Sequence, residues 1–286
     1  FQVIFPKGWQ CSEIGKYQVQ CQPPDKSAEV QARITATGYE LVQEDFLSFA
    51  HSEMVHAHAD DKEYVETERD EDEGNLKVGA SWRMEDMYWN GSDVFIRGRG
   101  AILHLQLAAK RESSPMYDDV FAQIAESAEI LTAGLKGAKL YPHRTTHTAP
   151  YAAFEIDVPT SWLLYEDAGT VAKTVIDEFF SPDKRASLQI AVYQHGDIIE
   201  QDLKAGKTTE ILRALYGHDL RVSHDKALPD GRERLEWHAA VKNIHGISFF
   251  DTIGSTLYIY CILWEDTTAE IYKPLLEEIA ETFTIE

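Results

Sequence analysis

The strongest constraint on this chain is that its opening stretch returns in the second half. Residues 1–9 read FQVIFPKGW, and residues 154–162 read FEIDVPTSW. Three large or conformationally restricted residues recur at a spacing of 153, since Phe1, Pro6 and Trp9 return as Phe154, Pro159 and Trp162. A chain of 286 residues has the length of two domains. The repeat therefore predicts that one domain is present twice.

Each copy of this stretch has the pattern of a half-buried strand that ends in a turn. Aromatic and β-branched residues recur at every second position over residues 1–5 and 154–158, which is typical of a strand with one buried face. The proline ends the strand because it lacks a backbone donor. Gly8 or Ser161 then makes the turn, and we expect the tryptophan that follows to anchor this turn to the core.

The rest of the two halves matches in the same order. The recurring positions are Pro24-Asp25-Lys26 with Pro182-Asp183-Lys184 (spacing 158), Trp82, Gly91 and Phe95 with Trp237, Gly246 and Phe250 (spacing 155), and Leu103 and Leu105 with Leu257 and Ile259 (spacing 154). Near the end of each half, IAESAEI at 124–130 matches IAETFTI at 279–285. We therefore predict a first domain over 1–131, a linker over 132–153 and a second domain over 154–286.

Each half is predicted to combine strands with one internal and one final helix. Residues 42–59 place apolar side chains on one helical face, namely Phe46, Phe49, Ala50, Met54 and Ala57. Residues 198–216 are the less regular counterpart. Asn-Gly tolerates positive φ, so Trp89-Asn90-Gly91 predicts a tight hairpin turn, and the acidic run ERDEDEG at 68–74 predicts another. Strands joined by tight turns with few helices predict an α+β fold with an antiparallel sheet.

This arrangement resembles the PsbP/Mog-like superfamily. The resemblance rests on F-x-x-x-x-P-x-x-W at both entry stretches, on the order of strands and helices, and on the final helices. It implies two tandem domains, each a curved antiparallel sheet sandwiched between helices. It also implies a non-enzymatic role, because members include thylakoid-lumen photosystem accessory proteins, Ran-binding nuclear proteins and bacterial envelope lipoproteins. It assigns no functional residue in this chain, and the tandem, the acidic run and the acidity set this chain apart.

The charge balance argues against two classes of partner. The net charge is −21, divided as −10 over residues 1–140 and −11 over residues 141–286. Both halves would repel nucleic acid and anionic lipid, so we expect neither as a partner. The excess of acidic residues is typical of a soluble surface, and a cationic partner is the alternative. No run of about 18 apolar residues exists, so we expect no membrane span.

Two of the three cysteines flank a predicted turn. Cys11 and Cys21 lie on either side of IGKY and are either a cross-strand disulfide or two free thiols. A disulfide would indicate an oxidising compartment. Cys261 lies in the apolar run LYIYCILW and is expected in the core.

One polar stretch contains side chains that could bind a metal ion. HSEMVHAHADD begins at His51, and its residues His56, His58 and Asp60 would converge if the helix ended near Ala57. The alternative is a solvated helix face. The acidic run at 68–74 lacks the ordered ligand spacing of a calcium loop. RGRGA at 97–101 lacks the third glycine of a dinucleotide-binding turn.

Four aromatic residues fall in predicted turns or in the linker, where they either bind a partner or pack the two domains. They are Tyr88, Trp89, Tyr141 and Tyr151. No catalytic motif emerges, so we expect a non-catalytic binding or assembly protein with an unidentified protein partner and no cofactor. The resemblance favours an extracytoplasmic setting (periplasm, envelope or lumen), with the cytoplasm as the alternative, and it leaves room for a lipid anchor before residue 1. The second hypothesis is a metal- or small-ligand-binding domain pair with weak hydrolytic activity.

Overall fold

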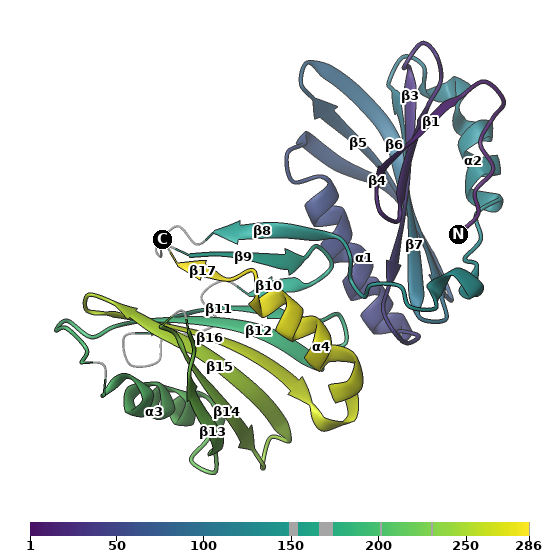
Figure 1. Cartoon of the computed structure of the whole chain (residues 1–286). Helices are drawn as coiled ribbons and strands as arrows, with labels where there is room; N and C mark the ends of the chain where they lie inside the picture. The colour runs from purple at the N-terminus through teal and green to yellow at the C-terminus, as the bar shows by residue number, and fades with distance from the viewer. Residues whose placement is uncertain (149–153, 166–173, 201, 230, 286) are drawn as a thin grey trace. The chain divides into compact units, whose positions relative to one another are not determined.

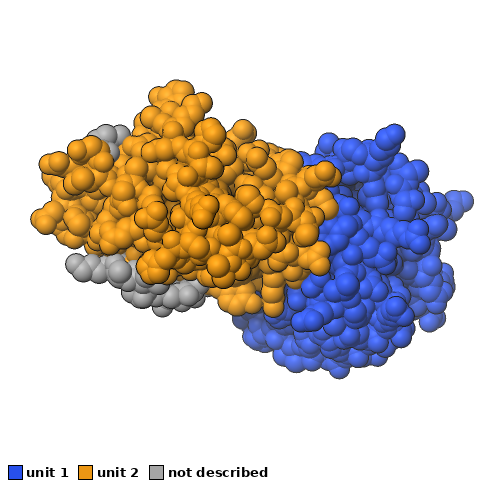
Figure 2. Space-filling view, turned by 90° about the horizontal axis from the view of Figure 1, so that it is seen from below, with its two compact units in different colours: residues 1–144, 159–161 blue, residues 145–158, 162–286 orange. Residues whose placement is uncertain are grey.

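The computed structural model describes residues 1–148, 154–165, 174–200, 202–229 and 231–285. The chain forms two compact units, coloured separately in Figure 2. Unit 1 comprises Phe1–Arg144 and Pro159–Ser161, and unit 2 comprises Thr145–Val158 and Trp162–Glu286. Within the described residues, each unit contains one seven-stranded antiparallel sheet and two α-helices, so the predicted α+β fold class is confirmed.

Unit 1 has the sheet order β1-β2-β3-β7-β6-β5-β4. Its strands are β1 (Gln10–Gly15), β2 (Gln18–Gln22), β3 (Ala28–Ala36), β4 (Lys62–Asp72), β5 (Asn75–Met84), β6 (Met87–Gly98) and β7 (Ala101–Lys110). Helix α1 (Gln43–Ala57) follows β3, and α2 (Asp118–Glu126) follows β7 and the 3-10 turn η1 (Ser114–Met116). The 3-10 turn η2 (Thr132–Leu135) comes next.

Unit 2 has the sheet order β10-β11-β12-β16-β15-β14-β13. Its strands are β10 (Leu163–Tyr165), β11 (Thr174–Phe180), β12 (Ala186–Gln194), β13 (Arg221–Ala227), β14 (Glu233–Ala239), β15 (Ile244–Ile253) and β16 (Thr256–Glu265). Helix α3 (Lys204–Tyr216) follows β12, and α4 (Ala269–Ala280) follows β16 and the 3-10 turn η3 (Asp266–Thr268). A small sheet with the order β17-β9-β8 contains β8 (Arg144–Thr148), β9 (Phe154–Pro159) and β17 (Thr284–Ile285).

The two sheets have the same topology. In both units the third strand pairs with the seventh, one helix follows the third strand, and another follows the seventh. Figure 1 shows α1 and α2 on opposite sides of the first sheet, and α3 and α4 on opposite sides of the second. Successive side chains of a strand point to opposite faces of the sheet. Each strand can therefore supply apolar side chains to a helix on either face. In β16, Leu257, Ile259 and Cys261 pack in the α3 core, while the residues between them face the other way.

The tryptophan of each entry stretch packs against a tyrosine of the final helical region, as the sequence predicted for the anchor. The Trp9 and Tyr117 ring centroids lie 6.0 Å apart at an interplanar angle of 77°. The Trp162 and Tyr272 centroids lie 6.3 Å apart at 79°. Both contacts are edge-to-face, which aromatic pairs favour. Two units with the same edge-to-face pair at matching positions support duplication.

A glycine beneath a tryptophan also recurs. A Cβ atom added to Gly246 would lie 2.2 Å from Trp237, which is directly opposite it on β14. A Cβ atom added to Gly91 would lie 2.9 Å from Trp82 and 2.0 Å from the Leu107 carbonyl oxygen. Both positions therefore require glycine so that a buried indole can cross the sheet surface. The registers differ, because Gly91 is opposite Ala80.

Two local predictions are wrong, and a third is confirmed only in part. Residues 1–5 do not form a full strand, because only Gln2 pairs, with Glu129. Trp89-Asn90-Gly91 lies inside β6, and the chain turns instead at Glu85-Asp86, where Glu85 has a φ of 54°. The acidic run contains the predicted hairpin turn at Glu73-Gly74, but its earlier residues continue β4 as far as Asp72. Since β4 is an edge strand, its charges hinder pairing with another sheet.

The match of Leu103 with Leu257 at a spacing of 154 is also wrong. Leu103 packs in the α2 core of unit 1, whereas Leu257 packs in the α3 core of unit 2. A shift of one residue along a strand moves every side chain to the other face. The spacing of 155 therefore applies here as well, and Leu103 corresponds to Tyr258.

The structure also places the cysteines and the segment between the two halves. Cys11 and Cys21 are cross-strand partners in β1 and β2 and form a disulfide, which was one of the two alternatives. Cys261 is buried, and burial raises the pKa of its thiol to about 12. Within the predicted linker 132–153, the described residues include η2 and β8, and the domain boundaries at 131 and 154 stay a prediction. None of the described helices has the length and apolar character needed to cross a bilayer.

Candidate functional site

A network of contacts between charged and polar side chains lies on the α1 face of the first sheet. Arg33 of β3 and Glu53 of α1 form an ion pair with Nη2 and Oε2 at 2.5 Å. Arg33 also donates a hydrogen bond to His104 Nδ1 of β7 at 3.0 Å. The other ring nitrogen of His104, Nε2, lies 2.7 Å from Asp93 Oδ1 of β6. Glu53, Asp93 and His104 are all buried, so these contacts form inside the unit.

The network continues at the end of α1. His58 directly follows α1, and its Nε2 lies 2.9 Å from Asp93 Oδ2. Its Nδ1 lies 2.6 Å from Asp61 Oδ2. The His58 ring also contacts Trp82 with ring centroids 5.0 Å apart. Asp93 is thus bound by two histidines, one on each carboxylate oxygen.

The alternation of β7 explains why His104 enters this network. Leu103, Leu105 and Leu107 point into the α2 core. His104 and Gln106 alternate with them and therefore lie on the α1 face. His104 stacks on Phe95 with centroids 4.1 Å apart, and Arg33 is its direct cross-strand partner on β3. The sheet register thus fixes the network.

The contacts determine the protonation of both histidines. Arginine can only donate, so His104 Nδ1 accepts, and Nε2 carries the proton that is donated to Asp93. Burial lowers the pKa of His104, and this outweighs the opposing effect of Asp93, so the ring is neutral. Burial would also lower the pKa of His58, but hydrogen bonds and charge from Asp93 and Asp61 raise it overall.

The carboxylates remain ionised despite their burial. Burial alone would raise the pKa of Asp93, but the hydrogen bonds from His104 and His58 outweigh it and lower this pKa to about 2. Burial also opposes ionisation of Glu53, yet the charge of Arg33 lowers its pKa overall. The network therefore contains fixed charges in a region with little water.

A polar cavity of about 230 Å³ opens beside this network. It is lined by Gln18, Gln31, Arg33, His56, Ala57, His104 and Gln106. The side chain of Arg33 is 14% exposed, so the guanidinium borders both the cavity and the buried contacts. This lining offers several N–H donors from one guanidinium and three carboxamides.

The second unit has no such network at the matching positions. Spacings of 158 and 155 place Ala191 and Ile259 at the positions of Arg33 and His104. Ala191 and Ile259 are direct partners on β12 and β16, as Arg33 and His104 are on β3 and β7. Both belong to the apolar α3 core. The fold therefore forms with apolar side chains at these positions.

This contrast identifies the network as the candidate functional site. Taking charges out of water costs several kcal/mol per ion, roughly, and well-packed apolar residues are often as stabilising as a buried ion pair. Unit 2 has the same topology, and the positions on its strands that match Arg33 and His104 are occupied by apolar residues. A network of buried ionised groups beside a cavity is typical of a functional site.

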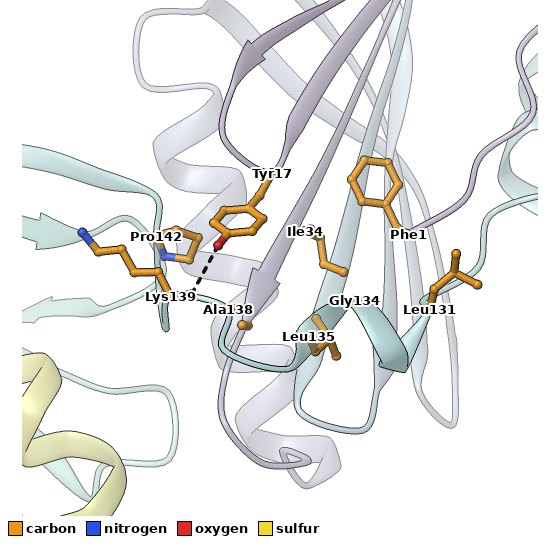
Figure 3. A pocket seen from close by; sticks show the side chains of 10 residues that line it. Phe1, Tyr17, Ile34, Leu131, Gly134, Leu135, Ala138, Lys139 and Pro142 are labelled. Carbon is orange, nitrogen blue, oxygen red and sulfur yellow. Dashed lines mark hydrogen bonds between the residues drawn. The ribbon is translucent and has the colours of Figure 1, made fainter.

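Unit 1 also has an apolar cavity of about 220 Å³, shown in Figure 3. Its lining residues come from the chain start, β3 and the segment around η2, and those labelled in the figure are Phe1, Tyr17, Ile34, Leu131, Gly134, Leu135, Ala138, Lys139 and Pro142. The Lys139 backbone N–H donates a hydrogen bond of 3.4 Å to the Tyr17 hydroxyl. This cavity offers mainly apolar surface, and Lys139 contributes the one charged side chain of its lining.

Comparison with known proteins gives distant structural likenesses. No family model matches the sequence, and no curated protein matches it. The chain is similar to the solution structure of cyanobacterial PsbP (CyanoP) from Synechocystis sp. PCC 6803, with 13% identity and a TM-score of 0.41 over 52% of this chain and 96% of that one. Likeness at this level does not establish a family, so membership of the PsbP/Mog-like superfamily stays a prediction.

Two structures from Pseudomonas aeruginosa are also similar. A protein of unknown function described as a putative regulator has 15% identity and a TM-score of 0.31, covering 44% of this chain and 88% of that one. The T6SS immunity protein TplEi, complexed with a peptide, has 10% identity and a TM-score of 0.26, covering 98% of each chain. Neither assigns a function to this chain.

The predicted metal ligands do not meet at one point. His56 lines the polar cavity, His58 is held between Asp93 and Asp61, and Asp60 is exposed. Burial lowers the pKa of His56. A metal ion at these residues would require His58 to leave at least one carboxylate. Metal binding by His56, His58 and Asp60 stays a prediction.

The four predicted partner-binding aromatics differ in exposure. Tyr88 is 40% exposed, whereas Trp89 and Tyr141 are 6% and 0% exposed. Trp89 and Tyr141 are therefore buried and, unlike Tyr88, expose almost no surface to a partner. Trp89 packs in a small cluster with Trp82, because it lies within β6 and not in a turn. Tyr151 lies outside the described residues, and partner binding by Tyr88 stays a prediction.

The sequence reasoning missed Arg33, Asp93 and His104. A signal was present, because polar residues occupy every second position of EVQAR (Glu29, Gln31 and Arg33), whereas the matching stretch of the second half reads SLQIA. Comparing the two halves position by position would have revealed Arg33 and His104 where the other copy has Ala191 and Ile259.

Proposed function

We propose that this chain is a non-catalytic binding and assembly protein that holds a protein partner through a carboxylate of that partner at the polar cavity of unit 1. The observation that supports this most is the buried network of Arg33, His104 and Asp93, because Ala191 and Ile259, which lie at the positions of Arg33 and His104 in unit 2, belong to an apolar core. The network fixes one face of Arg33, and the cavity borders the other.

A carboxylate fits the chemistry of the lining. Arginine presents planar N–H donors that match a carboxylate, and such charge-assisted hydrogen bonds are stronger than neutral ones. Gln18, Gln31 and Gln106 add carboxamides around the same space. His104 has both nitrogens engaged with Arg33 and Asp93, so it positions the guanidinium and does not take a proton from a ligand.

The charge of the chain restricts the partner. At a net charge of −21, a freely acidic protein would be repelled at long range. We therefore expect the recognised carboxylate to lie within a basic surface of the partner. The Cys11–Cys21 disulfide supports an extracytoplasmic setting, because disulfides persist in oxidising compartments.

Titration with small carboxylates tests the cavity directly. We expect succinate, followed by amide NMR, to shift signals of β2, β3, β7 and the end of α1 in a saturable way. His56→Ala should weaken this effect, because His56 lines the cavity. His51→Ala is the matched control, since His51 is an exposed residue of the same helix.

Two results would contradict the proposal. One is a titration in which shifts stay linear and scattered over the surface. The other is an equal response in wild type and His56→Ala. If the cavity does bind succinate, the same pair of variants should then differ in retaining partners from a native envelope fraction.

The second candidate is a metal- or small-ligand-binding function with weak hydrolytic activity at His56, His58 and Asp60. The position of His56 at the cavity favours it, since a ligand could reach that ring. Elemental analysis of purified protein tests it. One equivalent of metal that disappears in both His56→Ala and His58→Ala would support this candidate over the first.

A further inference from the structure

Three side chains of unit 2 with metal-ligating groups lie close together. His238 of β14 and His245 of β15 are direct cross-strand partners. Asp266 follows β16 and begins η3. One ligand atom from each residue lies within 4.8 Å of the other two. Among the described residues, this is the only group of His, Cys, Asp or Glu side chains that meets this spacing.

The hydrogen bonds of this cluster leave one nitrogen unused. His245 Nε2 lies 2.5 Å from Asp266 Oδ1, which accounts for that pair. The two imidazole rings stack with centroids 4.1 Å apart and an interplanar angle of 19°. His238 Nε2 is buried and has no hydrogen-bond partner. Buried polar atoms nearly always have a partner, so this one requires an explanation.

We propose that His238, His245 and Asp266 bind a divalent transition-metal ion of the zinc type. Imidazole nitrogen and carboxylate oxygen are the ligands such ions take at about 2.0–2.2 Å, and a site with three protein ligands keeps a fourth position open. A tetrahedral ion places its ligand atoms roughly 3.3 Å apart. The present atoms need only a modest approach, and Asp266, 48% exposed, has room to rotate.

Rigid elements hold the two histidines. They lie on adjacent central and near-edge strands, and His245 stacks on Trp264 of β16 with centroids 6.1 Å apart. The ammonium group of Lys273 in α4 lies over the Trp264 ring, 5.7 Å from its centroid. Because the two rings stack nearly parallel, their in-plane lone pairs do not point at one position, so one imidazole must turn and the carboxylate must move on binding.

The fold itself does not require this histidine pair. In unit 1 the register places Ser81 opposite Asn90 at the corresponding position of β5 and β6. Neither residue binds zinc readily. The cluster is therefore specific to unit 2, as the polar network is specific to unit 1. It is separate from the site proposed above for a carboxylate.

Calorimetric titration of the full chain with Zn²⁺ tests this site. We expect binding of one equivalent at this site, and we expect His238→Ala and Asp266→Asn each to weaken it at least tenfold. Asp266→Asn should leave the fold intact, since that side chain is exposed. His224→Ala, an exposed histidine of β13, is the matched control and should bind as wild type does.

Cobalt gives a second readout. Co²⁺ at this site should show visible absorption bands of a four-coordinate ion, and these bands should be lost in His245→Ala and retained in His56→Ala. Unchanged Zn²⁺ affinity in both His238→Ala and Asp266→Asn would overturn the proposal. So would Co²⁺ bands that depend on His56 and not on His245.

Discussion

Asp93 and His58 determine how the stability of unit 1 depends on pH. The pKa of Asp93 is lowered to about 2, so its carboxylate stays ionised throughout the neutral range. The pKa of His58 is raised, because the effects of Asp93 and Asp61 outweigh burial. A group whose pKa is raised on folding stabilises the folded state below its unfolded pKa, here about 6.5. This contribution is lost as the pH rises through the folded pKa.

His58→Gln should therefore destabilise the protein more at low pH than at high pH. We expect the difference in unfolding free energy between wild type and variant to be larger at about pH 5.5 than at about pH 9. Urea unfolding at several pH values measures it. Asp93 is ionised at both values and does not produce this trend. A difference that is constant with pH would show that folding does not shift the pKa of His58.

Asp93→Asn tests the cost of breaking the buried network. Removing one partner of a buried charged pair costs about 3–5 kcal/mol, because the remaining groups stay buried without compensation. The carboxamide keeps one acceptor oxygen and presents an N–H donor in place of the other, so one of the two histidines would lose its acceptor and the buried negative charge would be gone. Asp225→Asn, on exposed β13, is the control and should change stability little. A loss below about 1 kcal/mol would show that water or rearrangement replaces the carboxylate.

At the scale of elements, β6 and β15 each contain one glycine, Gly91 and Gly246, that cannot carry a side chain because a tryptophan lies against it. Gly246→Ala would place a methyl group 2.2 Å from Trp237. We expect a loss of about 1–3 kcal/mol, typical of overpacking in a core. Gly206 of α3 has open space around it, so Gly206→Ala should instead stabilise by about 0.5–1 kcal/mol. Thermal unfolding of the two variants should show shifts of opposite sign.

The Cys11–Cys21 disulfide stabilises the edge strand β1 of the first sheet. β1 is an edge strand, and Cys11–Cys21 closes a short loop with a sequence separation of 10. Such a loop contributes about 2–3 kcal/mol in the chain-entropy view. We expect a reducing agent to lower the stability of the wild type, whereas the double variant Cys11→Ala, Cys21→Ala should not respond. An equal response of both proteins would contradict this assignment.

The elements were predictable where a pattern repeats within one segment, and not where distant strands meet. Helix α1 was predicted over 42–59 and spans Gln43–Ala57, because its apolar face repeats at the helical period. The Asn-Gly turn was wrong, because Gly91 serves the packing of Trp82 and not a hairpin. The network of Arg33, Asp93 and His104 depends on the pairing of three strands, which a single sequence does not determine.

At the scale of the whole molecule, two copies of one topology have different interiors. Unit 1 places Arg33 and His104 on its α1 face, whereas the matching strand positions of unit 2, Ala191 and Ile259, belong to an apolar core. The sequence repeat predicted that the two halves share one fold, since Phe1, Pro6 and Trp9 return as Phe154, Pro159 and Trp162 at a constant spacing. The apolar residues at the matching positions of unit 2 show that this topology does not require the buried charges of unit 1.

The small sheet predicts where the second unit begins. β8 belongs to the sheet β17-β9-β8, and His147 Nε2 lies 3.2 Å from Asp177 Oδ2 of β11. A fragment of residues 144–286 should therefore be more stable than one of residues 154–286. Denaturant unfolding of both fragments measures the difference. Equal stability would show that β8 is dispensable and would support the boundary at 154.

The single free cysteine has a practical consequence. Cys261 is buried in β16, and the other two cysteines are joined in unit 1. A thiol reagent can therefore react only when the core of unit 2 opens. The labelling rate at a few denaturant concentrations would then give the opening free energy of that unit alone, without any engineered probe and without a signal from its neighbour.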